Sequence, residues 1–206
     1  MKSRRVTGGE NPALVECLNE VIPVYAIRWD VQPNNGTFGA SKQGTNYMEA
    51  QVWHKPTVQE CQNAILEWHN RRIDNEILSG FSWNGMSVWL STENQFNYKA
   101  AFDLAVQTEG ATLPVTFKFG STLDPVYHEF TTLEDLTDFY TKAMAYVNTA
   151  LKAGWMRKEA IDWVPYGGEP KPEEPVEEQP VEEPAEDPSQ CTEEDVTPST
   201  EEEGQA

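Results

Sequence analysis

The chain has 206 residues, of which 38% are hydrophobic and 11% aromatic, and its formal net charge is −19. This length and apolar content suit one ordinary globular domain. The acidic balance argues against nucleic acid as a partner, since phosphate binding needs clustered basic side chains, and small groups such as Lys2, Arg4 and Arg5, or Arg71-Arg72, do not make a convincing footprint. No apolar run approaches the roughly 20 residues of a membrane span and no secretory leader is visible, so we expect a soluble chain with no membrane partner.

The N-terminal third is predicted to contain two strands and little else. Residues 1–22 show no sustained pattern and are expected to be flexible, with a short helix starting at Asn11-Pro12. Residues 23–30 alternate in a way typical of a strand, and residues 46–54 do so again. The second strand places Met48, Ala50 and Val52 on one face and Tyr47, Glu49, Gln51 and Trp53 on the other.

A helix followed by a hairpin forms the centre of the chain. Thr57 and Glu60 make a capping box, which predicts a helix to about Leu78 that Gly80 ends. Asn84-Gly85 then suits a two-residue type I′ turn between two short strands. In this register Trp83 pairs with Met86 and Phe81 with Val88, while Ser82, Ser87 and Trp89 share the opposite face.

The C-terminal half of the body repeats the order of helix, hairpin and helix. A helix from Glu93 to about Gln107 is predicted to be capped by Thr92, with Gln95 completing a capping box. Residues 113–119 alternate as a half-buried strand, and residues 126–130 return beside it. Thr131 and Glu134 then start a long amphipathic helix that is expected to end near Ala153-Gly154.

These elements predict a single α+β domain over residues 23–164, with a mainly antiparallel sheet and about three helices packed as one layer against it. Residues 165–206 are expected to form a disordered tail. From Glu169 onward the chain has 15 acidic residues against one Lys and half of its 14 prolines, so it cannot bury enough apolar surface to fold. Such a tail is either a solubilising spacer or a contact arm for a basic partner.

No recognised catalytic, nucleotide-binding or metal-binding motif occurs, so no enzyme activity, cofactor or metal is predicted. The three cysteines are widely spaced, which indicates neither a disulfide framework nor a zinc site. One alternative remains, in which Asp135, Asp138 and His128 form an acid pair or a cation site. The simpler interpretation is that acidic residues in the first turn favour the helix dipole.

Aromatic residues are the one feature that predicts a binding surface. Exposed rings often hold protein partners or sugars, although core packing is the commoner fate of such residues. The candidate partner-binding residues are Trp89, Ser82, Ser87, Trp53 and Tyr47.

Several segments resemble a known family. They are AIRWD at Ala26–Asp30, the pair Lys55-Pro56, GFSWNGMSVWLSTENQFN at Gly80–Asn97, LPVTFKFG, and KAMAYVNTALKAGWMRKEAID. Over about residues 20–164 the chain resembles a small domain of unknown function that bacteriophages and prophages encode, especially in Bacteroidales. That domain occurs in tail-fibre-type and other virion-associated proteins. The N-terminal part is also similar to the entry domain of tail-fibre assembly proteins.

The resemblance implies a non-enzymatic role in the phage particle or its assembly, with no catalytic residues to carry over. The expected partners are other virion or tail proteins, with a homo-oligomer as a further option, and the expected location is the virion after assembly in the host cytoplasm. A soluble chaperone or adaptor for tail-fibre assembly is the alternative function. The acidic tail is not part of the shared pattern.

Overall fold

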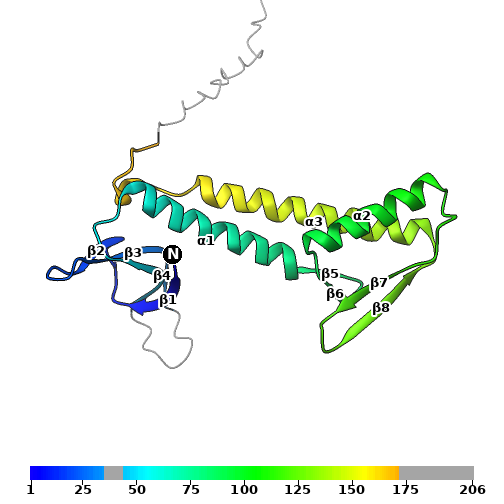
Figure 1. Ribbon diagram of the computed structural model, residues 1–206, viewed down its shortest axis with the longest axis horizontal. Helices are drawn as coiled ribbons and strands as arrows, with labels where there is room; N and C mark the ends of the chain where they lie inside the picture. Colours follow the sequence, from blue (N-terminus) through cyan, green and yellow to red (C-terminus); the bar gives the residue numbers. More distant parts are fainter. Residues whose placement is uncertain (35–43, 172–206) are drawn as a thin grey trace, which may run out of the picture. The chain divides into compact units, whose positions relative to one another are not determined.

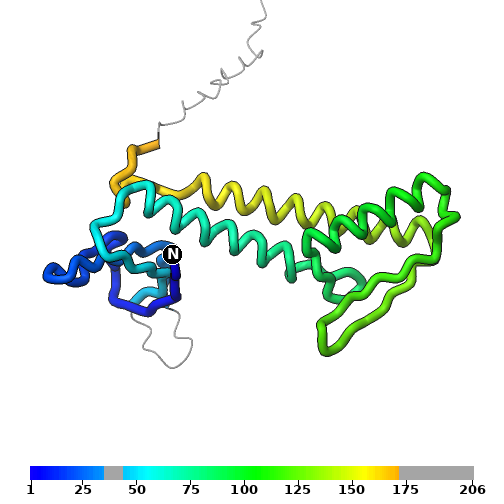
Figure 2. The backbone as a smooth tube through the Cα atoms, in the orientation of Figure 1, coloured from blue at the N-terminus to red at the C-terminus, as the bar shows by residue number. Residues whose placement is uncertain are grey.

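The computed structural model describes residues 1–34 and 44–171, and it has the predicted α+β class. Figure 1 shows the elements, and Figure 2 traces the chain from the first strands along α1 to two hairpins and back along α3. The elements are β1 (Ser3–Gly8), β2 (Val15–Asn19), β3 (Val24–Pro33), β4 (Thr45–Val52), α1 (Val58–Ser79), β5 (Phe81–Trp83), β6 (Met86–Val88), α2 (Thr92–Gln107), β7 (Val115–Gly120), β8 (Pro125–Phe130), α3 (Leu133–Glu159) and the 3-10 helix η1 (Val164–Tyr166).

The first four strands form an antiparallel sheet in the order β1-β4-β3-β2. The expectation of a flexible N-terminus with a short helix is therefore wrong. Asn11 has a φ of 57°, which lies outside the right-handed helical region and turns the chain between β1 and β2. Both strands lie at the edges of the sheet, where pairing with an inner strand defines them rather than a hydrophobic pattern of their own.

One face of this sheet packs against the first half of α1 and forms the smaller of two hydrophobic cores. The strands contribute Ile27, Trp29, Met48, Ala50 and Val52, and α1 contributes Cys61 and Ile65. Tyr166 from η1 completes this core, and its hydroxyl donates a hydrogen bond of 2.7 Å to the Arg28 carbonyl. The folded body therefore extends beyond Val164. The remainder of the predicted tail, residues 172–206, lies outside the described residues.

The opposite face of the sheet buries a charged pair. Arg28 Nε donates to Glu49 Oε2 over 3.0 Å, and Arg28 Nη1 donates to Glu16 Oε2 over 2.5 Å. The ring of Tyr47 lies 5.3 Å from the Arg28 guanidinium carbon. Because both charges are buried, removal of either one would leave the other unpaired in the interior.

Helices α1 and α3 lie side by side (Figure 1) and are linked by an ion pair of 2.8 Å between Arg157 Nη2 and Glu76 Oε2. Helix α1 has the predicted capping box at Thr57 and Glu60. Helix α3 begins one residue later than predicted, at the cap Thr132, and continues past Gly154. Gly154 does not end the helix, because it is buried against Ile73 of α1, where only a residue without a side chain fits.

The larger core joins the second half of α1 to α2, α3 and both hairpins. Its centre is a group of packed rings, in which Trp83 contacts Phe130 and Phe139 at ring distances of 5.2 and 5.5 Å. Helix α2 packs on α3 through stacked Phe102 and Tyr140. The assumption of one helical layer on one sheet is wrong, since the described strands form three separate sheets and serve two cores.

Candidate binding groove

The hairpin β5–β6 has the predicted geometry. Asn84 and Gly85 have φ values of 48° and 76°, as a type I′ turn requires, and Phe81 pairs with Val88 and Trp83 with Met86. Alternation then continues past β6: Val88 and Leu90 are buried, whereas the side chain between them, Trp89, is 50% exposed. A hydrogen bond of 3.0 Å from Leu90 N–H to the Leu78 carbonyl fixes this segment to the end of α1.

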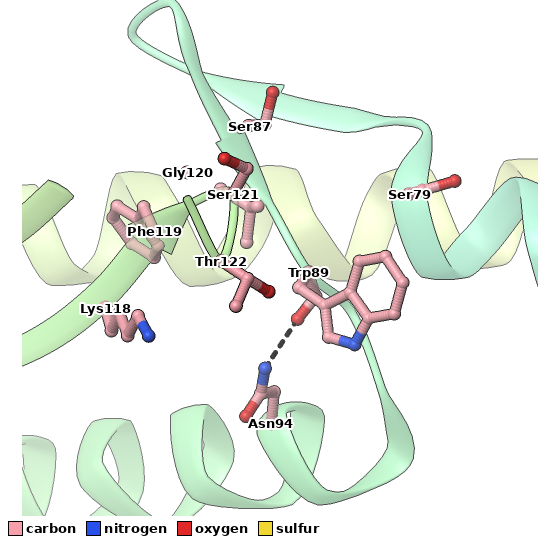
Figure 3. A pocket seen from close by; sticks show the side chains of 10 residues that line it. Ser79, Ser87, Trp89, Asn94, Lys118, Phe119, Gly120, Ser121 and Thr122 are labelled. Atoms are coloured by element: carbon pink, nitrogen blue, oxygen red, sulfur yellow. Dashed lines mark hydrogen bonds between the residues drawn. The ribbon is translucent and has the colours of Figure 1, made fainter. Parts of the chain in front are cut away.

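Trp89 borders a pocket of about 560 Å³ between the two hairpins (Figure 3). The lining residues are Ser79, Ser87, Val88, Trp89, Asn94, Lys118, Phe119, Gly120, Ser121 and Thr122. Figure 3 shows Lys118 of β7 and Trp89 on opposite sides of this pocket. We call it the Trp89 groove. Its volume lies within the range of about 300–1,000 Å³ that is typical of ligand sites.

Some polar groups that line the Trp89 groove are engaged in hydrogen bonds within the protein, and others are free to bind a ligand. Asn94 Nδ2 donates to the Trp89 carbonyl over 2.8 Å, the bond drawn in Figure 3, and Ser121 Oγ accepts from Asp124 N–H over 3.0 Å. Lys118 and the hydroxyl of Ser87 have no partner among the described residues. The groove therefore offers an aromatic surface, an unpaired ammonium group and a hydroxyl, a combination that suits the binding of a protein partner.

A comparison with protein families matches residues 59–177 to a domain of unknown function, DUF4376. This match covers more than half of the chain. The chain belongs to the DUF4376 family. No curated protein and no solved structure gives a significant match.

The DUF4376 region contains every residue that lines the Trp89 groove, and it begins at the second residue of α1. Strands β1 to β4 precede it. The groove therefore belongs to the part of the chain that defines the family, whereas most of the smaller core does not.

The predicted partner-binding residues do not form one surface. Ser87 and Trp89 line the groove, and Ser82 is exposed on the strand paired with Ser87. Trp53 is 72% exposed, but it follows β4 of the four-stranded sheet and does not line the groove. Tyr47 is only 6% exposed because it packs beside Arg28, so its assignment to a surface is wrong.

Asn94, Lys118 and Thr122 also line the groove, and sequence patterns did not single them out. Lys118 was recognisable only as an outward residue of an alternating strand. Its position opposite Trp89 depends on how the two hairpins pack, which no local pattern encodes.

The acid and histidine candidates have structural partners. Asp138 accepts hydrogen bonds from Lys142 over 2.8 Å and from Trp83 Nε1 over 3.0 Å, and these bonds, the one from Lys142 first, lower the pKa of Asp138. Asp135 follows the cap of α3, and His128 packs 4.9 Å from the Trp83 ring. Among residues 1–34 and 44–171, no group of three or more His, Cys, Asp or Glu side chains is arranged to hold a metal ion.

Across the described parts of the chain, no helix has both the length and the apolar character needed to cross a membrane.

Proposed function

We propose that this DUF4376 protein is a non-enzymatic structural component of a bacteriophage virion or tail, and that it binds another particle protein through the Trp89 groove. The observation that carries the binding role is the half-exposed Trp89, which borders a pocket of about 560 Å³ directly after the β5–β6 hairpin. Large aromatic anchors in pockets dominate the energy of many protein interfaces. The phage setting rests on the resemblance in sequence.

Further exposed aromatic and apolar side chains agree with a protein partner. Phe96 of α2 and Tyr127 of β8 are each more than half exposed. Aromatic residues are enriched at protein interfaces relative to other surfaces. The proposed partners are virion or tail proteins, a second copy of the chain among them, and the proposed site of assembly is the bacterial cytoplasm.

The first experiment is quantitative mass spectrometry of gradient-purified phage particles beside the infected-cell lysate. We expect a fixed copy number of this chain relative to the major capsid protein. Absence from the particles would contradict a virion role.

The second experiment tests the groove. Trp89→Ala should reduce incorporation into particles, since truncation of an interface anchor typically costs about 2 kcal/mol or more of binding energy. Trp155→Ala is the matched control, because Trp155 is similarly exposed, at 53%, but lies on α3 away from the lining residues. Equal incorporation of both variants would exclude Trp89 as the anchor.

The acidic segment favours one alternative, a soluble chaperone or adaptor for tail-fibre assembly. Residues 169–206 carry a net charge of −14, which suits transient contact with a basic surface of a fibre subunit. This function predicts abundant chain in the lysate, none in particles, and a complex with a fibre subunit that weakens as salt is raised. Failure to recover any fibre subunit with the chain would exclude the adaptor.

A further inference from the structure

A second cavity, of about 330 Å³, lies in the N-terminal part of the body, where β3, α1 and the segment after α3 meet. Its lining residues are Leu14, Trp29, Asp30, Val31, Ile65, His69, Ile161, Asp162, Pro165 and Tyr166. None of them lines the Trp89 groove. We call it the Trp29 cavity. Half of its lining is aliphatic or proline, so it suits a small and largely apolar molecule.

Trp29 provides the observation that indicates a ligand. Its side chain is 3% exposed, and its buried Nε1–H has no hydrogen-bond acceptor among the described residues. A buried donor without an acceptor costs about 1–3 kcal/mol, so native structures rarely retain one without a reason. Since the indole nitrogen can only donate, a ligand that relieves this cost must bring an acceptor oxygen.

The titratable side chains of the cavity differ in how far they are already occupied. Asp30 accepts hydrogen bonds from Arg5 Nη2 over 2.6 Å and from Gln32 Nε2 over 2.9 Å. Asp162 Oδ1 accepts from Val164 N–H over 3.0 Å. His69 has no hydrogen bond to any described residue, and its ring lies 4.8 Å from the Trp68 ring. The cavity therefore has engaged carboxylates and two unengaged nitrogen groups, the Trp29 indole and the His69 imidazole.

Cations outnumber carboxylates among the charges that act on His69. Burial lowers the pKa of His69 first, and the neighbouring charges of Arg72, Arg157 and Lys158 lower it further, against an opposing effect of Asp30. The imidazole is therefore neutral near pH 7 and keeps one N–H to donate. Arg157 is already paired with Glu76, so Arg72 and Lys158 are the cations that, with the two N–H donors, favour an anionic acceptor over a neutral one.

We propose that the Trp29 cavity binds a small, largely apolar monocarboxylate, whose oxygens accept hydrogen bonds from Trp29 Nε1 and His69. This site is independent of the Trp89 groove and of the proposed virion role. The charged group of the ligand lies toward Arg72 and Lys158, and its apolar part contacts Ile65, Ile161 and Pro165.

Benzoate is the probe for the full-length chain, with benzamide as its neutral counterpart of the same shape. In ¹⁵N-labelled protein, benzoate should shift the Trp29 indole N–H resonance saturably, and that resonance is identified by its loss in Trp29→Phe. Benzamide should bind about tenfold more weakly, because hydrogen bonds to charged groups exceed neutral ones by about 1 kcal/mol or more. Equal binding of the two probes would overturn the assignment of a carboxylate.

Arg72→Gln provides a test that does not disturb the core, since Arg72 is exposed and only stacks over Trp68 at 5.5 Å. This variant should weaken benzoate binding about threefold and leave benzamide unchanged, the effect expected for a screened surface charge. Arg71→Gln is the matched control, because Arg71 pairs with Glu67 and should have no effect. The proposal is overturned if benzoate at about 10 mM does not shift the Trp29 indole resonance. This concentration is about ten times the dissociation constant of a weak, millimolar site. It is equally overturned if the Trp29 Nε1–H proves to be hydrogen-bonded only to an ordered water molecule that benzoate does not displace.

Discussion

Gly154 shows how one residue fixes the contact between the two long helices. A Cβ atom built at this position would lie 2.3 Å from Ile73 Cδ1 and 2.4 Å from Ile73 Cγ1. In an exposed helix, replacement of Gly by Ala normally stabilises by about 1 kcal/mol. Here the added methyl group has no room, so the close approach of α3 to α1 at Ile73 requires glycine.

We therefore expect Gly154→Ala to lower the free energy of unfolding by about 1–3 kcal/mol, the usual cost of overpacking a core. Urea denaturation followed by circular dichroism measures it. Combination with Ile73→Ala, which removes the obstructing atoms, should make the two effects less than additive. Additive losses would show that Gly154 acts by another route.

Tyr98 links burial to alkaline stability. Burial among the rings of the larger core raises the pKa of Tyr98 to about 12, and burial also raises the pKa of Tyr166 in the smaller core. The folded protein therefore holds the neutral phenol more strongly than the unfolded chain does, whose tyrosines ionise near pH 10. This contribution is complete below about pH 10 and decreases as the pH rises toward 12.

Tyr98→Phe removes this ionisation but keeps the ring. The variant should lose less stability than the parent chain between about pH 10 and pH 12, where an ordinary tyrosine and Tyr98 differ in charge. Denaturation midpoints measured at several pH values in this window provide the test. Parallel curves for the two proteins would contradict the assignment.

At the scale of the element, the N-terminal caps of α2 and α3 each differ by one residue from the cap predicted from the sequence. Ser91 caps α2, since its Oγ accepts from Asn94 N–H over 3.2 Å, whereas the predicted cap Thr92 is the first helical residue. A displacement by one residue in the opposite direction occurs at α3, where Thr132 replaces the predicted Thr131. In both cases the sequence offers two adjacent hydroxyl residues, and the strand before the helix determines which one caps it.

Ser91→Ala should therefore destabilise the protein by about 1 kcal/mol, the typical loss for an N-cap hydroxyl. Thr92→Ala is the matched control and should change the free energy of unfolding by less than about 0.5 kcal/mol, as most surface substitutions do. Thermal denaturation of both variants distinguishes them. A larger loss in Thr92→Ala would restore the cap predicted from the sequence.

Local patterns predicted most of the elements correctly. Helical periodicity located α1 and α3, alternation located β3, β4 and β7, and Asn84-Gly85 fixed the register of the first hairpin. Strands β1 and β2 were missed because each is defined by its pairing with an inner strand. The Trp89 groove was likewise predictable only in part. Alternation indicated that Trp89 faces outward, whereas the positions of Lys118 and Asn94 around it depend on tertiary packing.

At the scale of the whole molecule, α1 belongs to both cores. Cys61 and Ile65 in its first half pack against the four-stranded sheet, and Ile73 and Ile77 in its second half pack in the larger core. Since the DUF4376 match starts within the first turn of α1, the family region alone would expose the first half of this helix.

A fragment of residues 56–171 tests whether the two cores are separable. We expect fast hydrogen exchange over the first half of α1 and retained protection over the second half, because the larger core remains intact. The thiol of Cys61, the sole cysteine of this fragment, should react with Ellman's reagent. In a full-length control with Cys17→Ser and Cys191→Ser, burial hides this thiol and raises its pKa, so it should stay unreactive. Uniform loss of protection would show that the two cores unfold together.

The edges of the four-stranded sheet have a consequence for solubility. Strands β1 and β2 each pair on one side only among the described strands, and open edges can join those of other copies into aggregates. Here β1 carries the exposed cations Arg4 and Arg5, and the pairing of β2 with β3 is irregular between Cys17 and Asn19. Arg4 is paired with Glu49 and Arg5 with Asp30, so repulsion between copies at low ionic strength comes from the net charge of −19 rather than from these two cations. Concentrated stocks should stay clear in dilute buffer and become turbid first when salt screens this repulsion.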